Sequence, residues 1–241
     1  MNKIPEISLL LPTRNRVWAL KRLFESIIKT TYDYKNIEIV LYIDEDDLQS
    51  RDITLNEITL KKITGPRQEM GKVLNTCYKE SKGHCLININ DDAVFETANW
   101  DILILNRIKD IQDEIYLIYG NDLHKGKKHP TFPGISRKVC EILDGFSHYG
   151  YERFLIETHL FDIFIKLRKL GYSRIFYMSD VIFEHRHYLA DKSSPDETYL
   201  SRNTYKDHHL FISLARDRHY SALKLAQYIC NIRNYCKNEL Y

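Results

Sequence analysis

Short apolar runs that end in polar turns alternate with amphipathic stretches along the first half of the chain. Residues 7–11 and 37–43 are almost entirely apolar and have the length of buried strands. Between them, residues 17–30 carry apolar side chains at the three- and four-residue spacing of a helix. Strand, helix and strand in this order predict a right-handed parallel unit with helices on the faces of a sheet.

Further elements continue this alternation. We expect strands at 58–63, 86–92, 114–119 and 174–178, and helices at 70–79, 100–111, 137–143 and 157–170. Residues 120–135 are typical of an irregular loop, and the composition changes near residues 191–195 before a helical pattern runs to residue 241. The pattern therefore predicts an α/β domain of residues 1–190, with a mostly parallel, Rossmann-like sheet flanked by helices, and a C-terminal helical extension of residues 191–241.

Acidic side chains follow two of the expected strands. Asp91 and Asp92 end the run at 86–92, and the acid-rich residues 44–47 follow the strand at 37–43. In open α/β sheets, ligands collect in the crevice beyond the carboxyl ends of the strands. Carboxylate oxygens suit Mg²⁺ or Mn²⁺, which often accompany phosphate-bearing substrates. Taken alone, the Asp91-Asp92 turn is better explained as a solvated loop and residues 44–47 are equally well explained so, but two acidic turns at one rim, beside the polar turn at 12–15, favour a binding site.

Composition narrows the class of protein. The 241 residues carry a formal net charge of +2, without the concentrated basic face of a nucleic-acid binder. The five cysteines have no CxxC spacing, and we find neither a leader-type apolar region nor a run of the roughly 20 apolar residues that a membrane span requires. We therefore expect a cytoplasmic protein with no nucleic-acid partner.

Several segments in a fixed order resemble those of family 2 glycosyltransferases of the GT-A fold, which are inverting and use nucleotide sugars. The Asn90-Asp91-Asp92 turn lies where that family has its DxD element, with Asn90 in place of the first acid. The resemblance covers about residues 5–190 and implies that residues 1–190 are a GT-A catalytic domain. The segments that carry it are 7–16, 40–46, 65–75, 90–92, 157–162, 166–172 and 179–185.

The resemblance also implies a donor site. Thr13, together with Asp44 or Glu45, would hold the nucleoside, and either Arg67 or Lys72 would contribute positive charge toward the base or phosphate. The full set implied for the nucleotide sugar is Pro12, Thr13, Arg14, Asp44, Glu45, Arg67, Lys72 and Asp91.

A divalent metal is implied by the same resemblance. Asp92 would bind the ion directly, Asp91 would approach the ribose or a metal-bound water, and His185 would supply a further ligand, with His187 as its competitor. Because Asn90 stands in place of one acid, the protein supplies few ligands to the metal. The imidazole of His185 favours Mn²⁺ over Mg²⁺. His185 is equally well explained as a structural histidine bonded to a neighbouring acid or to the backbone.

Glu157 is the candidate catalytic base. In the enzymes that the chain resembles, an acid at this place deprotonates the acceptor hydroxyl as its oxygen attacks the anomeric carbon. Asp162 and Glu152 are competing candidates. An acid in the first turn of a helix also complements the helix dipole, so that a purely structural role explains Glu157 as well.

The resemblance implies transfer of a sugar from a nucleoside-diphosphate sugar, with UDP favoured, to a hydroxyl of a glycan or lipid-linked acceptor in polysaccharide biosynthesis. A non-catalytic nucleotide- or glycan-binding GT-A module is the alternative that Asn90 favours. A sugar nucleotidyltransferase fits less well, because the turn at 12–16 has no glycine. The C-terminal segment fits peripheral contact with the inner face of a membrane, a packing helix or a homodimer contact. Its basic residues are Arg216, Arg218, Lys224, Arg233 and Lys237.

Overall fold

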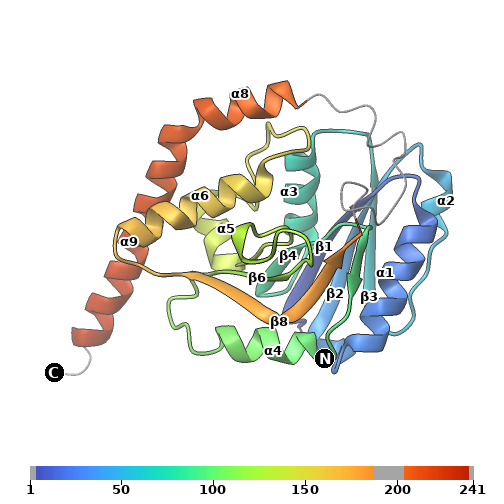
Figure 1. Cartoon of the computed structure of the whole chain (residues 1–241), viewed down its shortest axis with the longest axis horizontal. Coiled ribbons are helices and arrows are strands. Elements are labelled where there is room, and N and C mark those ends of the chain that lie inside the picture. Colours follow the sequence, from blue (N-terminus) through green and yellow to red (C-terminus); the bar gives the residue numbers. More distant parts are fainter. Residues whose placement is uncertain (1–3, 187–203, 239–241) are drawn as a thin grey trace.

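The strand–helix–strand unit expected at the N-terminus is present. In the computed structural model, which describes residues 4–186 and 204–238, β1 (Ile7–Thr13) pairs in parallel with β2 (Ile37–Asp44), and α1 (Val17–Thr30) connects them (Figure 1). Every residue of β2 is buried. Helices cover both faces of these strands, which explains why both read as continuous apolar runs.

Eight strands of the described residues form one sheet in the order β3-β2-β1-β4-β7-β6-β8-β5. β3, β2, β1 and β4 run parallel, whereas β7 is antiparallel to β4 and β6, and β5 is antiparallel to β8. The predicted α/β architecture, a mostly parallel sheet flanked by helices, is confirmed. The other strands are β3 (Thr59–Gly65), β4 (Cys85–Asn88), β5 (Ala93–Phe95), β6 (Leu117–Asn121), β7 (Gly134–Ser136) and β8 (Ile175–His185).

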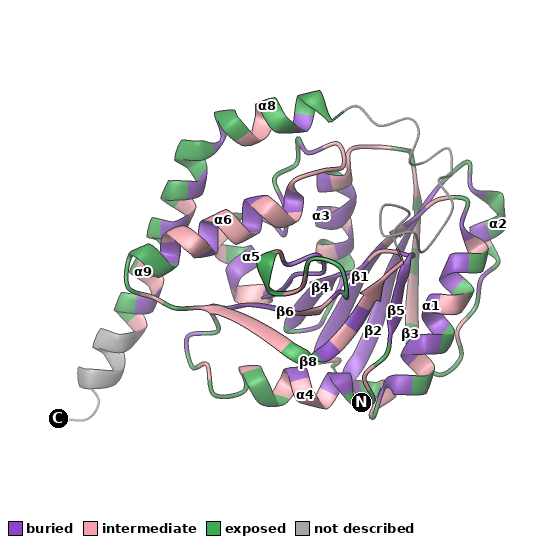
Figure 2. Ribbon diagram, in the orientation of Figure 1, coloured by how far each residue is buried: buried purple, intermediate pink, exposed green. Residues whose placement is uncertain are grey.

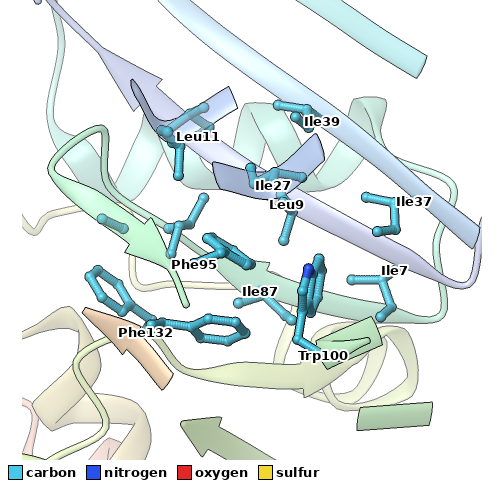
Figure 3. Packing of buried hydrophobic residues seen from close by; sticks show 14 of the residues in the cluster. Ile7, Leu9, Leu11, Ile27, Ile37, Ile39, Ile87, Phe95, Trp100 and Phe132 are labelled. Carbon is cyan, nitrogen blue, oxygen red and sulfur yellow. The ribbon is translucent and has the colours of Figure 1, made fainter. Parts of the chain in front are cut away.

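Alternate side chains of the central strands meet different sets of helices. On one face, Leu9 packs in a cluster with α1 and with Trp100 of α4 (Trp100–Ile108), and the edge of Trp100 meets Phe95 with ring centroids 4.8 Å apart (Figure 3). On the other face, Leu10 packs in a second cluster. The buried strands thus lie between two helical layers (Figure 2). The helices of the second layer include α3 (Met70–Glu80), α5 (Arg137–Leu143) and α6 (Ile156–Lys169).

The C-terminal helices belong to this second layer. α8 (Tyr205–Ser213) leads into α9 (Ala215–Asn238), which lies against α6 and α5 (Figure 1). Ala222, Leu225 and Ile229 of α9 are completely buried there. The predicted extension therefore shares the core of the α/β domain, although its proposed boundary at residue 190 lies outside the described residues. No helix in the described part of the chain has the length and apolar character of a membrane span.

Three local predictions differ from the structure. The strand expected at 86–92 ends at Asn88. Ile89 lies beyond the end of the strand but is still buried, and its apolar side chain made the strand look longer in the sequence. β8 is longer than the strand predicted at 174–178 and reaches His185. The loop predicted at 120–135 ends before Gly134, where β7 begins. Five short elements were not predicted: the strands β5 and β7, and the helical segments η1 (Tyr34–Asn36), α2 (Leu48–Arg51) and η2 (Gly126–Lys128).

Candidate active site

A cleft of about 740 Å³ lies at the carboxyl ends of β1, β2 and β4. This volume is within the range of about 300–1,000 Å³ that is usual for small-molecule sites. Two of the predicted residues, Glu45 and Lys72, do not line it. The predicted residues that do are Pro12, Thr13, Arg14, Asp44, Arg67, Asp91, Asp92, Glu157 and His185.

Asp91 is held at the floor of the cleft by the turn after β1. Its carboxylate accepts a hydrogen bond from Thr13 Oγ1 at 2.9 Å and one from Arg16 Nη1 at 3.0 Å. Burial raises the pKa of Asp91, and the neighbouring Asp92 charge raises it further, whereas Arg16 opposes the shift. Arg16 was not singled out from the sequence, yet its guanidinium is the cation that stabilises an ionised Asp91.

Asp92 and His185 meet across the β5–β8 pair. Asp92 Oδ1 lies 3.3 Å from His185 Nε2, and the backbone register that pairs Ala93 with His185 brings the two side chains together. The His185 backbone N–H donates to the carbonyl of Asp122 at 3.0 Å, and its ring packs against the edge of Phe132. The imidazole is therefore fixed in position by the strand that carries it.

Asp92 and His185 suit a metal ion that takes two of its ligands from the protein and the others from a substrate. One carboxylate oxygen and one imidazole nitrogen lie side by side, but the described residues contain no group of three His, Cys, Asp or Glu side chains arranged around one ion. An ion held by Asp92 and His185 would thus complete its shell with substrate oxygens and water. The competitor His187 lies outside the described residues.

The acidic turn after β2 is tied to the turn after β1. Arg14 Nη1 donates to Asp44 Oδ2 at 2.9 Å, and Arg14 Nη2 donates to Asp46 Oδ2 at 2.6 Å. The backbone N–H of Asn15 also donates to Asp47 Oδ2 at 2.7 Å. Asp44 is buried and faces the cleft, whereas the neighbouring Glu45 is exposed. Of the two acids proposed for the nucleoside, only Asp44 lines the cleft.

The two basic candidates are also separated by the structure. Arg67 lines the cleft, just after β3. Lys72 lies on the exposed side of α3, where its ammonium pairs with Glu69 at 2.9 Å. The helical phase of α3 directs Lys72 away from the cleft, so that Arg67 is the better placed of the two.

Glu157 lies in the first turn of α6 and faces the cleft. Asn88 Nδ2, at the end of β4, approaches Glu157 Oε1 at 3.4 Å. Burial raises the pKa of Glu157, while a backbone hydrogen bond and the positive charge of Lys125 act in the opposite direction. A carboxylate with a raised pKa is a stronger base, and this property suits proton abstraction from a hydroxyl.

The competing acids are engaged elsewhere. Asp162 bonds to Lys166 at 2.5 Å and to Arg218 at 2.6 Å, and it does not line the cleft. Burial alone would raise the pKa of Asp162, but the bonds to Lys166 and Arg218 lower it below its ordinary value. Glu152 does line the cleft, but it pairs with Lys206 at 2.7 Å and is partly exposed. Glu157 is therefore the acid best placed to act as a base.

The loop after β6 borders the cleft with Lys125 and Thr131. Its shape depends on Asp122, whose Oδ1 accepts backbone N–H groups of residues 124, 125 and 126 at 3.1, 2.8 and 2.7 Å. The sequence predicted only an irregular loop here, and it gave no signal for this buried carboxylate.

Comparison with known proteins identifies the family of the chain. Residues 8–161 match the family described as Glycosyl transferase family 2. No curated protein matches the chain.

Solved structures with a similar architecture include a mannosyltransferase and TarS. The mannosyltransferase PcManGT from Pyrobaculum calidifontis, in complex with GDP-Man and Mn²⁺, is 14% identical with a TM-score of 0.57, and the match covers 99% of this chain and 81% of that one. S. aureus TarS 1–349 in complex with UDP-GlcNAc is 16% identical with a TM-score of 0.61, over 93% of this chain and 71% of that one. In a further TarS structure, at 15% identity and a TM-score of 0.57, the match covers 74% of this chain and 36% of TarS, so this chain spans about a third of that structure. At these identities the likeness shows the fold alone.

Proposed function

The chain belongs to glycosyl transferase family 2 and is a glycosyltransferase of the GT-A fold, and from this we propose the reaction that its cleft performs. The proposed reaction moves a sugar from a nucleoside-diphosphate sugar, with UDP favoured, to a hydroxyl of a glycan or lipid-linked acceptor, with inversion at the anomeric carbon. The observation that carries this proposal is that Asp92, His185 and Glu157, far apart in the sequence, line one cleft at the strand ends.

The donor would lie over the ends of β1 and β2. Asp44 would accept hydrogen bonds from the nucleoside with the help of Thr13 and Arg14, while Arg67 would meet the base or a phosphate. The similar structures contain GDP-Man, UDP and UDP-GlcNAc, which supports a nucleoside-diphosphate donor. The preference for UDP as the nucleotide of the donor rests on the resemblance of the sequence motifs to those of the family.

Asp92 and His185 would hold a divalent cation, for which Mn²⁺ fits the mixed oxygen and nitrogen donors better than Mg²⁺. When bound, such an ion supplies positive charge for the diphosphate leaving group. The presence of Mn²⁺ in the PcManGT complex supports this choice. Asp91, fixed by Thr13 and Arg16, would face the ribose or a water near the ion.

Glu157 would accept the acceptor's hydroxyl proton. As the proton moves to the carboxylate, the acceptor oxygen forms a bond to the anomeric carbon, and the bond from that carbon to the diphosphate oxygen breaks with its electron pair remaining on the diphosphate. A single in-line displacement of this kind inverts the configuration. Lys125 contributes a positive charge close to Glu157 and lines the same cleft.

We also propose that the outer face of α8 and α9 rests on an anionic membrane surface, where a lipid-linked acceptor would be presented. Arg218, counted among the basic residues of this segment, is buried against Asp162 and does not belong to that face. Asp217 is the one exposed acid from residue 205 to residue 232. The exposed apolar and basic side chains of the face are Tyr205, Ile212, Tyr220, Leu223, Arg216 and Lys224.

One experiment tests the proposed reaction. The protein is incubated with UDP-, GDP-, CMP- and dTDP-sugars, with and without Mn²⁺, and both the free nucleotide and the melting temperature are measured. We expect one class of donor to raise the melting temperature, because it binds the folded state alone, and to release nucleotide when Mn²⁺ is present. A non-catalytic binding module would show the thermal shift without release, and a protein that shows neither effect with any donor would contradict the proposal.

A further inference from the structure

A carboxylate on α8 holds the backbone that leads into the catalytic helix. Asp207 is completely buried in the first turn of α8. Its Oδ1 accepts the backbone N–H of Glu152 at 2.8 Å, and its Oδ2 accepts those of Arg153 at 3.0 Å and Phe154 at 2.7 Å. Three consecutive N–H groups that converge on one anion form a concave nest, and here a side chain of the protein fills it.

The nest lies next to the proposed base. Glu152, Arg153 and Phe154 all line the cleft, and α6 starts two residues after Phe154. The residue between them, Leu155, has φ of 65°, a left-handed conformation that is unfavourable for a side chain of this kind. Such a conformation persists only where its surroundings impose it. The three bonds to Asp207 impose the path of the chain into the first turn of α6, where Glu157 lies.

A second contact joins the same helices. Arg218 of α9 is buried, and its Nε donates to Asp162 of α6 at 2.6 Å. Its guanidinium also stacks on Phe211 of α8, 3.7 Å from the ring centre. The C-terminal helices thus contact the chain at two places, residues 152–154 before Glu157 and Asp162 after it. In addition, Thr204 and His208, on either side of Asp207, line the cleft.

We propose that Asp207 is a positioning residue of the transfer reaction, which fixes Glu157 and the adjoining wall of the cleft through the backbone of residues 152–154. The inference rests on the proposed function. It gives the C-terminal helices, which lie beyond the matched residues 8–161, a direct part in the geometry of the active site. An acid in the first turn of a helix also complements the helix dipole, but that role does not require three bonds to another segment.

Asp207→Asn tests the proposal, with Asp101→Asn as a matched control. Asp101 is also completely buried near the start of a helix and accepts two backbone N–H groups, those of Tyr32 and Asp33, both at 3.0 Å, but it does not line the cleft. Each substitution replaces one carboxylate oxygen by an NH2 group, which donates hydrogen bonds and cannot accept one. Both variants should therefore lower the melting temperature.

The two variants should differ in turnover. With the nucleotide sugar that the wild type hydrolyses in the presence of Mn²⁺, Asp207→Asn should lower kcat by about 10- to 100-fold, as expected for a displaced catalytic group, and leave the donor KM within about twofold. Asp101→Asn should leave both constants unchanged. Equal kcat values for Asp207→Asn and the wild type, or an equal loss in both variants, would overturn the proposal.

Hydrogen exchange of the wild type gives a second measurement that does not depend on a folded variant. The amides of residues 152–154 should exchange as slowly as those in the buried strands, because their bonds open only when α8 leaves the nest. Rapid exchange at these three amides would overturn the proposal. A folded wild type that neither binds nor hydrolyses any donor rejects the proposed function and this inference together, whereas an active wild type with an unaffected Asp207→Asn variant rejects this inference alone.

Discussion

The carboxylate of Asp92 lies 3.3 Å from the imidazole of His185, although the two residues are far apart in the sequence. Asp92 lies in the turn between β4 and β5, and His185 ends β8, which pairs antiparallel with β5. The antiparallel edge of the sheet therefore brings a second type of ligand to the carboxyl ends of the parallel strands. This relationship makes the divalent metal the first property to test.

Asp92→Asn and His185→Gln should each lower Mn²⁺-dependent turnover by about 100-fold, because each would remove a ligand of the proposed ion, whose charge would stabilise the leaving group by several kcal/mol. The measurements are the rate of nucleotide release and the thermal shift that the donor produces with Mn²⁺. A chelator should abolish turnover of the wild type. Asp113→Asn, which breaks a pair with Arg174 outside the cleft, serves as control and should leave the rate unchanged.

Glu157→Gln should lower the rate of sugar transfer or donor hydrolysis by about 10²–10⁴-fold, the usual contribution of a general base. The donor should bind as before, because the amide keeps the size of the side chain. Steady-state rates and a donor titration check the two parts. A variant that retains more than a tenth of the wild-type rate would exclude Glu157 as the base.

The same variant should also be more stable than the wild type at neutral pH. Burial raises the pKa of Glu157, so that the unfolded chain ionises at a lower pH than the folded one, and the wild type loses stability as the pH rises between these two values. Below the ordinary pKa of glutamate the two proteins should be equally stable. Urea denaturation at several pH values measures the difference.

Glu38→Gln is the control for this comparison. Glu38 is buried, whereas Glu157 is partly exposed, and the carboxylate of Glu38 accepts hydrogen bonds from Ser8 at 2.6 Å and from the backbone N–H of Gly83 at 3.1 Å. Removing these bonds should destabilise the protein at neutral pH by about 1–3 kcal/mol. If Glu157→Gln were destabilising to the same extent, the side chain of Glu157 would have a structural role instead.

Asp44→Asn should raise the donor KM by about tenfold and leave kcat unchanged, since a contact to the nucleoside is the same in the ground state and in the transition state. Asp46→Asn provides the matched control, because Asp46 bonds to the same Arg14 but is exposed and does not line the cleft. Its KM should stay within about twofold of the wild-type value. Loss of kcat in Asp44→Asn would place this carboxylate near the reacting atoms.

The outer face of α8 and α9 should bind vesicles of phosphatidylglycerol but not of phosphatidylcholine. Replacing Arg216 and Lys224 by Glu should weaken this binding by roughly tenfold or more, given about 1 kcal/mol for each basic residue near an anionic surface. Co-sedimentation at low and high salt measures the effect. Equal binding of both lipids would contradict the electrostatic part of the proposal.

The parts of the site that follow from local sequence could be predicted. Thr13, Asp44 and Asp92 stand where apolar runs end, and the strand–helix–strand order brings such ends to one rim. Glu157 and His185 were located only by the resemblance to a family, because no local pattern relates them to the other residues. All five line one cleft, and their roles stay predictions.

Contacts between distant segments could not be predicted. Nothing near Arg16 indicates that it pairs with Asp91, and an acid in the first turn of α8 gives no sign that it accepts three N–H groups from residues 152–154. Lys72 is the opposite case: it was a candidate from its place in the sequence, but the rotation of α3 about its own axis decides whether its side chain faces the cleft or solvent. Such contacts depend on the tertiary fold and are visible only in coordinates.

Asp122 and Asp207 each accept hydrogen bonds from main-chain N–H groups of a loop that borders the cleft. Because the bonds from residues 124–126 and 152–154 come from the main chain, side chains such as Lys125 and Phe154 can be replaced by any residue except proline without removing a donor, whereas Thr131, whose hydroxyl donates to Asp122, has to be kept. A mutational library confined to these loops would therefore vary the recognition of the incoming glycan while the folding of the enzyme stays intact.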